Sequence, residues 1–203
     1  SAGTSNAGSS AASIGPSAKM LRPLGNAEPA EIYAGFHRQL SALLAAGIDM
    51  VCIETVMDLK EAALAIKAAR SLDLKIPIMT TVTFGKSPQG YFTLMGTSVK
   101  DAVAALEEAG ADIIGSNCGE GAMQMVEIAR EFRQHAHVPV AIQSNAGLPV
   151  KGEAGLMYPE TPDFVAARAA EMLDLGVQIV GGCCGTTPEH IRALRKMVDA
   201  RLK

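Results

Sequence analysis

LLAAGIDMVCIE (residues 43–54) passes from a helical pattern through a single glycine into a short apolar run. LEEAGADIIGSN (106–117) and MLDLGVQIVGGC (172–183) repeat this arrangement further along the chain. A glycine at such a joint can end a helix in the left-handed conformation, which costs other residues free energy. The three repeats therefore predict helix-to-strand connections in which each helix ends at the glycine.

The rest of the chain continues the alternation between helical and apolar patterns. We expect helices over residues 28–46, 58–71, 98–109 and 121–134, from Pro162 to Gly176, and from Pro188 to the end. We expect strands over residues 11–15, 48–54, 76–84, 111–118, 138–147 and 177–184. Such strands are apolar on both faces, which is typical of a parallel sheet covered by helices. Regular repetition favours an α/β fold of the (β/α)8 TIM-barrel type, with an open doubly wound sheet as the alternative.

The expected strands are too few for a complete eight-stranded barrel, which usually takes about 250 residues. We expect the first two βα units to be lacking in this chain. Residues 1–12, SAGTSNAGSSAA, are low in complexity and are expected to be flexible or a remnant of expression. The barrel domain is expected over residues 13–203. An incomplete barrel exposes sheet edges, which tend to pair with other strands. We therefore keep two alternatives, a homo-oligomer and a partner that covers these edges.

Composition narrows the class of protein. The chain has 203 residues, 48% of them hydrophobic, which is enough for one buried core. A net charge of −3 gives no reason to expect nucleic acid or a membrane surface as a partner. No apolar run approaches the roughly 20 residues of a membrane span, and no signal peptide is visible. Two of the four cysteines are adjacent, a pattern that favours metal or thiol chemistry in a reducing cytoplasm over disulfides.

Polar and sulfur side chains stand where the expected strands end. Ligands of parallel βα folds bind at the carboxyl ends of the strands. Zinc favours thiolates in tetrahedral geometry, and three cysteines leave one position for a substrate. Glycines around the adjacent cysteine pair permit the sharp turn that aims both at one ion. The strand-end residues are Glu54, Asn117, Cys118, Asn145, Cys183 and Cys184.

Each of these residues also has a plainer interpretation. The cysteine pair could be small apolar packing, and Cys52, in mid-strand, is predicted to be core packing only. Glu54 could interact with the N-terminus of the helix that follows it. Asn145 could make a turn. His190, in the first turn of the last helix, is a weaker candidate for metal or acid–base chemistry.

Six segments of the chain resemble the homocysteine S-methyltransferase family, and most of all the homocysteine-binding domain of cobalamin-dependent methionine synthases. The resemblance begins near residue 11 and covers nearly all of the chain that follows. VGGCCGTTPEHIRAL, with NCG upstream, is highly specific, whereas IET alone would be weak. The segments are VGGCCGTTPEHIRAL (180–194), GSNCGEG (115–121), IET (53–55), SNAGLP (144–149), YPETPDF (158–164) and SIGPS (13–17).

The resemblance implies a barrel enzyme that forms methionine from homocysteine. It implies zinc on Cys118, Cys183 and Cys184, with these cysteines as the catalytic group. It implies that Glu54 holds the substrate's amino group and that Asn117 supports the zinc site; we take both, with Asn145, as candidate substrate-binding residues.

The methyl donor in this family is methylcobalamin, S-methylmethionine, S-adenosylmethionine or betaine. No corrinoid-binding histidine motif is visible, so cobalamin would come from another domain or a corrinoid protein. A non-catalytic zinc scaffold, or a methyltransferase for another thiol or selenol, remains an alternative.

Overall fold

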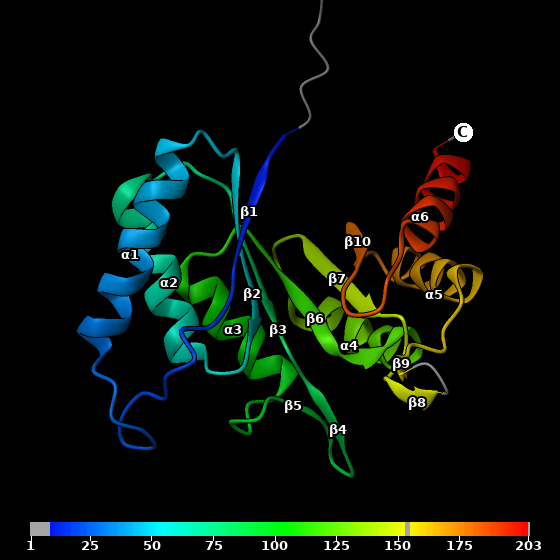
Figure 1. The fold of residues 1–203 in the computed structure, drawn as a ribbon, viewed down its shortest axis with the longest axis horizontal. Coiled ribbons are helices and arrows are strands. Elements are labelled where there is room, and N and C mark those ends of the chain that lie inside the picture. The colour runs from blue at the N-terminus through cyan, green and yellow to red at the C-terminus, as the bar shows by residue number, and fades with distance from the viewer. Residues whose placement is uncertain (1–8, 153–154, 203) are drawn as a thin grey trace, which may run out of the picture.

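Six parallel strands form the central sheet in the computed structural model, which describes residues 9–152 and 155–202. The strands lie side by side in the order β1–β2–β3–β6–β7–β10, and every neighbouring pair is parallel (Figure 1). Their bounds are β1 Ala11–Ile14, β2 Met50–Val56, β3 Ile78–Val82, β6 Ile113–Gly121, β7 Val140–Asn145 and β10 Ile179–Gly182. All six strands that the sequence predicted are present.

The helices that follow these strands also agree with the sequence prediction. Their bounds are α1 Pro29–Ala45, α2 Leu59–Leu72, α3 Val99–Ala109, α4 Ala122–His135, α5 Pro162–Asp174 and α6 Pro188–Arg201. Asp58, Ser98 and Thr161 each accept a backbone hydrogen bond as N-cap residues. The joints at Gly47, Gly110 and Gly176 have φ of 82°, 91° and 89°, the left-handed conformation that the repeats predicted.

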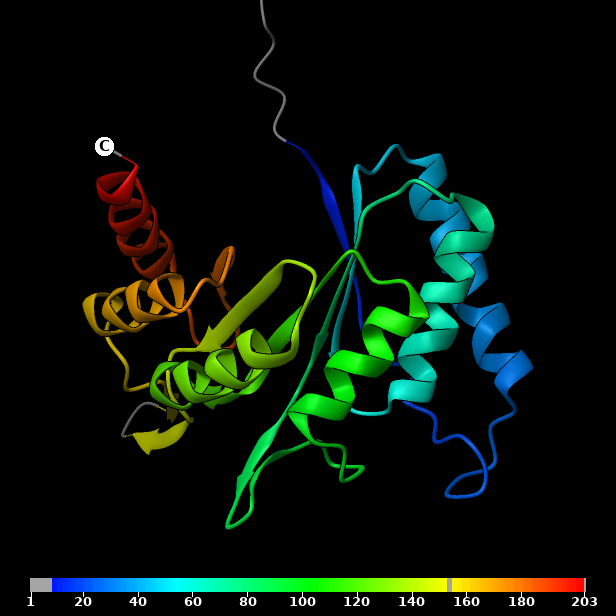
Figure 2. The ribbon, with the colours of Figure 1, turned by 180° about the vertical axis from the view of Figure 1, so that it is seen from behind.

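The strand order decides between the two predicted sheet types. A doubly wound sheet reverses its strand order at a switch point, whereas here each new strand is added on the same side of the last. Right-handed crossovers that all advance in one direction place their helices on one face of the sheet. Figure 2 shows this face, with α3 and α4 in front of the strands. The fold is therefore a six-stranded part of a TIM-type barrel.

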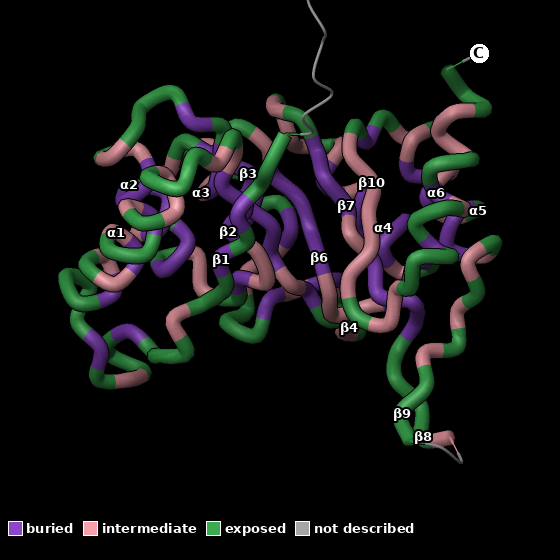
Figure 3. The backbone as a smooth tube through the Cα atoms, turned by 45° about the horizontal axis from the view of Figure 1, so that its top comes forward, coloured by how far each residue is buried: buried purple, intermediate pink, exposed green. Residues whose placement is uncertain are grey.

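Most residues of the central strands are buried (Figure 3), and they belong to a core on each face of the sheet. The helix-covered face includes Val51 and Ile53 in the main core. The opposite face carries a smaller buried cluster of Cys52, Met79 and Ala141. Cys52 is 7% exposed, so its prediction as core packing is confirmed.

Two features of the chain differ from the sequence prediction. Strand β1 begins at Ala11, so the expected boundary at residue 13 moves two residues toward the N-terminus; residues 1–8 of the expected flexible segment lie outside the described residues. Two small antiparallel hairpins were not predicted, because strands this short carry no periodic pattern. They are β4 (Gly85–Ser87) with β5 (Gly90–Phe92), and β8 (Val150–Gly152) with β9 (Gly155–Met157). Within the described ranges, no helix has the length and apolar character to cross a membrane.

Candidate metal centre

Three cysteine sulfurs converge at the carboxyl ends of the strands. The Sγ atoms of Cys118, Cys183 and Cys184 all lie within 4.8 Å of one another. Cys118 belongs to β6, and the other two follow β10 directly; these strands flank β7 on either side. Zn–S bonds of about 2.3 Å in tetrahedral geometry place two sulfurs about 3.8 Å apart. The Sγ atoms of Cys118 and Cys184 are 3.8 Å apart, so the cluster fits a zinc ion.

The backbone turns sharply at both cysteine segments. Cys118 has φ of 59°, a left-handed conformation that is uncommon outside glycine, and Gly119 continues it with φ of 74°. After the adjacent pair, Gly185 has φ of 78°. The predicted role of glycine in this turn is therefore observed at Gly185.

Asn117 is a buried side chain that adjoins the cysteine cluster and ties it to two neighbouring strands. Its Oδ1 accepts hydrogen bonds from the Thr55 amide and the Thr81 hydroxyl, both at 2.8 Å. Its Nδ2 donates to Thr55 Oγ1 at 2.8 Å and approaches Cys183 Sγ at 3.8 Å. The side chain is 1% exposed and its amide is fully used by the protein. Its surroundings therefore favour a supporting role over substrate contact.

Asn145, at the end of β7, positions the second cysteine segment. Its Oδ1 accepts a hydrogen bond from the Cys184 amide at 3.0 Å. The Cys183 amide donates to the carbonyl of Ser144 at 2.7 Å, and the Ala146 amide donates to the carbonyl of Cys184 at 2.9 Å. Three hydrogen bonds therefore join residues 144–146 to the cysteine pair.

Burial, together with negative charge on Cys118 and Cys184, raises the pKa of the Cys183 thiol to about 12. A thiol with a pKa raised this far keeps its proton at neutral pH unless a cation compensates the charge. Metal binding to such a group releases protons and favours the thiolates. The donor set thus suits a thiophilic divalent cation.

Glu54 lies near the end of β2 and is half-buried. Its carboxylate accepts a hydrogen bond from the Ser13 hydroxyl on the neighbouring strand β1. The next residue, Thr55, is bonded to Asn117, so Glu54 adjoins the support of the cysteine cluster. One carboxylate oxygen is thereby oriented by the protein.

The sequence pattern gave no role for several residues around the site, although Thr55 lies in the segment IET and Tyr158 in YPETPDF. Thr55 and Thr81 hold Asn117 through contacts that join three strands. Tyr158 lies next to Cys184, and burial raises the pKa of its hydroxyl, with negative charge on Cys184 adding to the rise. Glu160 was part of a recognised segment, YPETPDF, but no role could be read from that pattern.

His190 is not among the residues that could hold a metal ion in the described part of the chain. It is 6% exposed and belongs to the capping box of α6 with Thr187. Its other ring nitrogen, Nε2, lies 2.9 Å from the Glu160 carbonyl. Its role is structural, and the suggested metal-ligand role is not supported by this geometry.

Residues 3–198 match the family described as homocysteine S-methyltransferase. The chain is 37% identical over 191 residues to methionine synthases of Mycobacterium leprae and Mycobacterium tuberculosis. These matches cover 92% of this chain but only 16% of either relative. A rat betaine–homocysteine S-methyltransferase 1 is 30% identical over 181 residues, and this match covers 81% of this chain and 43% of the relative.

Solved structures support the same fold. The apo form of the homocysteine methyltransferase MmuM from Escherichia coli superposes with a TM-score of 0.70 at 20% identity. The match covers 92% of this chain and 61% of that one. The metallated form of MmuM gives a TM-score of 0.68, also at 20% identity, with 84% of this chain and 52% of that chain covered.

Proposed function

Because this chain belongs to the homocysteine S-methyltransferase family, we propose that it holds a zinc ion on Cys118, Cys183 and Cys184 and transfers a methyl group to L-homocysteine, forming methionine. The observation that carries the proposal is the convergence of the three sulfurs within 4.8 Å at the carboxyl end of the sheet. The chain spans about a sixth of the methionine synthases that it matches. We therefore propose, for this chain, only what a methionine synthase would do with the segment that the chain matches.

The bound ion supplies positive charge that favours the thiolate form of a thiol at neutral pH. The thiolate is the nucleophile in methyl transfer. Free alkyl thiols are mostly protonated at neutral pH, because their pKa is about 8.5 or above. Asn117 and Asn145 keep the cysteines in place through the hydrogen bonds described above. We assign to Glu54 the ammonium group of homocysteine, since its carboxylate is half-buried and oriented by Ser13.

Transfer of the methyl group from the donor to the homocysteine sulfur needs no oxidant or reductant. The thiol proton is released, the sulfur forms a bond to the methyl carbon, and the bond between methyl group and donor breaks. The donor keeps the electron pair of that bond. We propose methylcobalamin, carried by another domain or a corrinoid protein, as the donor, because the two mycobacterial relatives are methionine synthases far longer than this chain. Free thiols that hold zinc also fit a reducing compartment such as the cytoplasm.

Zinc-edge X-ray absorption of the purified protein, with and without L-homocysteine, tests the proposal. We expect three sulfurs and one light atom around zinc, changing to four sulfurs when homocysteine is added. Three sulfurs that never change would leave a zinc scaffold without this substrate. Competition by other thiols or selenols in the same measurement would show whether homocysteine is the preferred substrate.

A further inference from the structure

Residues 158–160 pack against the three segments that form the metal centre: the irregular end of β6 at residues 118–121 (the Cys118 loop), the loop after β7, and the turn after β10 (the Cys184 loop). At three glycines, an added Cβ would collide with this segment: Gly121 after Cys118, Gly147 after Asn145, and Gly185 after Cys184. The Cβ at Gly121 would overlap Glu160 Oε1, and the Cβ at Gly185 would overlap the Tyr158 ring. At Gly147 it would lie 3.0 Å from Glu160 Cγ.

The Glu160 side chain holds the start of α4. Its Oε2 accepts a hydrogen bond from the amide of Ala122, the first residue of that helix, at 2.9 Å. The N-cap residue Gly121 has no side chain to do this. A carboxylate at a helix N-terminus also interacts favourably with the helix dipole. Glu160 thereby fixes the far end of the loop in which Cys118 adopts its left-handed conformation.

The Glu160 backbone holds the other side of the site. Its amide donates to the Ala146 carbonyl at 3.0 Å, and the Ala146 amide donates to the Cys184 carbonyl at 2.9 Å. The Thr187 amide donates to Nδ1 of His190 at 3.1 Å. That ring nitrogen is therefore the acceptor, and Nε2 carries the proton donated to the Glu160 carbonyl. One residue thus connects the Cys118 loop, the loop after β7 and the start of α6.

We infer that Glu160 is a positioning residue of the metal centre, which sets the Cys118 loop against the Cys184 loop so that the three sulfurs can share one ion. This inference rests on the proposed function, because it takes the cysteine cluster to be a zinc site. Glu160 acts through the backbone of the two loops, as its carboxylate and its amide both contact main-chain groups. Residues of this kind around metal sites commonly change metal affinity by about 10- to 100-fold.

The test compares zinc affinity in Glu160→Ala, Glu160→Gln and wild-type protein, with the melting temperature of each metal-free protein. We expect Glu160→Ala to weaken zinc binding by roughly 10- to 100-fold. We expect Glu160→Gln to recover part of this loss, because an amide oxygen can still accept from Ala122. The absorption spectrum of the Co²⁺-substituted protein should also change in Glu160→Ala.

The matched control is Glu107→Ala. The Glu107 carboxylate also accepts backbone hydrogen bonds from a loop, at His137 and Val138, but before β7 rather than after it. We expect this variant to lose stability while keeping zinc affinity and the Co²⁺ spectrum. If Glu160→Ala behaves in the same way as this control, Glu160 is only a structural residue and the inference is wrong.

A second variant covers the case in which Glu160→Ala fails to fold. Gly121→Ala keeps the glutamate but places a methyl group where Glu160 Oε1 lies. We expect weaker zinc binding in this folded variant too, and unchanged affinity would overturn the inference. A wild-type protein that binds no zinc would overturn this inference and the proposed function together, whereas zinc binding that is insensitive to both sites would overturn this inference alone.

Discussion

Asn117 shows how one side chain can stabilise an unfavourable backbone at the site. Thr55 and Cys118 have φ of 61° and 59°, a conformation that costs residues other than glycine about 1 kcal/mol or more. Asn117 accepts a hydrogen bond from the Thr55 amide and directly precedes Cys118. The two unfavourable conformations therefore lie next to the hydrogen bonds of the buried Asn117 amide, which hold the backbone in place. The left-handed backbone at Cys118 turns its sulfur toward the other two.

Cys52 gives a pH prediction at the same scale. Burial, together with the negative charge of Glu54, raises the pKa of its thiol from 9.0 to about 11. A raised pKa means that the folded protein keeps a proton that the unfolded chain has lost. The contribution to stability is therefore complete below about pH 9 and is lost as the pH rises toward 11.

We expect Cys52→Ala to reduce this alkaline loss of stability. Urea unfolding of the metal-free protein at about pH 8 and about pH 10.5 measures the change in both proteins. Loss of packing in the variant lowers stability equally at both pH values, so only the difference between them is informative. An identical pH dependence in wild type and variant would contradict the prediction.

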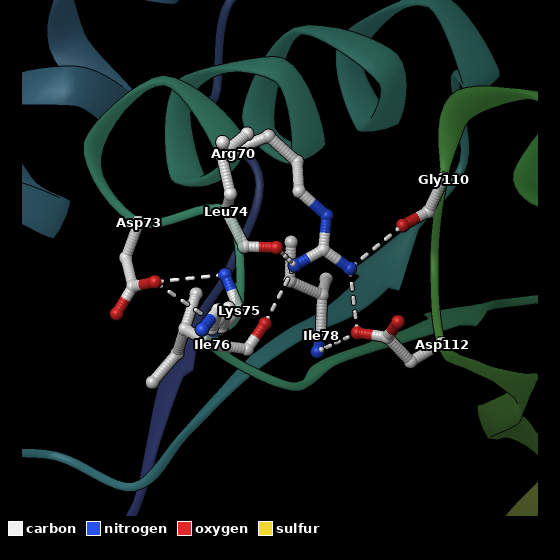
Figure 4. A network of polar contacts seen from close by, with 8 residues as sticks. All are labelled: Arg70, Asp73, Leu74, Lys75, Ile76, Ile78, Gly110 and Asp112. Atoms are coloured by element: carbon white, nitrogen blue, oxygen red, sulfur yellow. Dashed lines mark hydrogen bonds and ion pairs between the residues drawn. The ribbon is translucent and has the colours of Figure 1, made fainter.

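At the scale of elements, Arg70 joins two helix-to-strand connections at the amino ends of the strands (Figure 4). From the last turn of α2, it donates to the Ile76 carbonyl at 2.6 Å and to the Gly110 carbonyl at 2.9 Å. It also pairs with Asp112 at 2.6 Å, and that carboxylate accepts from the Ile78 amide. The guanidinium thus fixes the entry of β3 against the entry of β6.

We expect Arg70→Lys to destabilise the protein by about 1–3 kcal/mol, because one ammonium group cannot reach the same set of acceptors. Arg195→Lys is the control, since Arg195 forms an exposed pair with Asp199 within α6 and should change stability by less than about 0.5 kcal/mol. Urea unfolding measures both. Zinc affinity should not change in either variant, because Arg70 lies at the opposite end of the strands from the cysteines. Equal effects of the two substitutions would refute this assignment.

At the scale of the molecule, the cysteine cluster connects strands that are not neighbours. Cys118 comes from β6 and the adjacent pair from the end of β10, with β7 between them. An ion bound to all three sulfurs therefore adds a link across the sheet that the unfolded chain lacks. A ligand that binds only the folded protein stabilises it by about 4 kcal/mol at a concentration of 1,000 times its Kd.

We expect zinc to raise the melting temperature of the wild-type protein and a chelator to reverse the rise. Cys183→Ala should show neither response, since it removes one of the three sulfurs. Cys52→Ala should keep the full response, because Cys52 belongs to the buried apolar cluster. Differential scanning calorimetry with and without zinc makes the comparison. A melting temperature of Cys183→Ala that rises as much as that of wild type would place the zinc elsewhere.

The alternating helices and parallel strands follow from the sequence itself. Local patterns are enough for this, because a glycine that ends a helix and an apolar run that starts a strand lie side by side in the chain. The convergence of Cys118 with the cysteine pair could also be predicted, since the carboxyl ends of parallel strands meet at one edge. Glycine after the pair signalled the turn that brings both sulfurs toward one point.

Only the tertiary structure decided how that site is held. The bonds of Asn117 to Thr55 and Thr81 depend on the register of three strands, which no local pattern contains. The left-handed conformation of Cys118 carries no sequence signal, because cysteine has no preference for it. The packing of residues 158–160 against three distant glycines appears only after the loops are folded together. Short-range preferences thus determined the elements and where the cysteines stand, whereas contacts between residues far apart in the chain determined the geometry of the site.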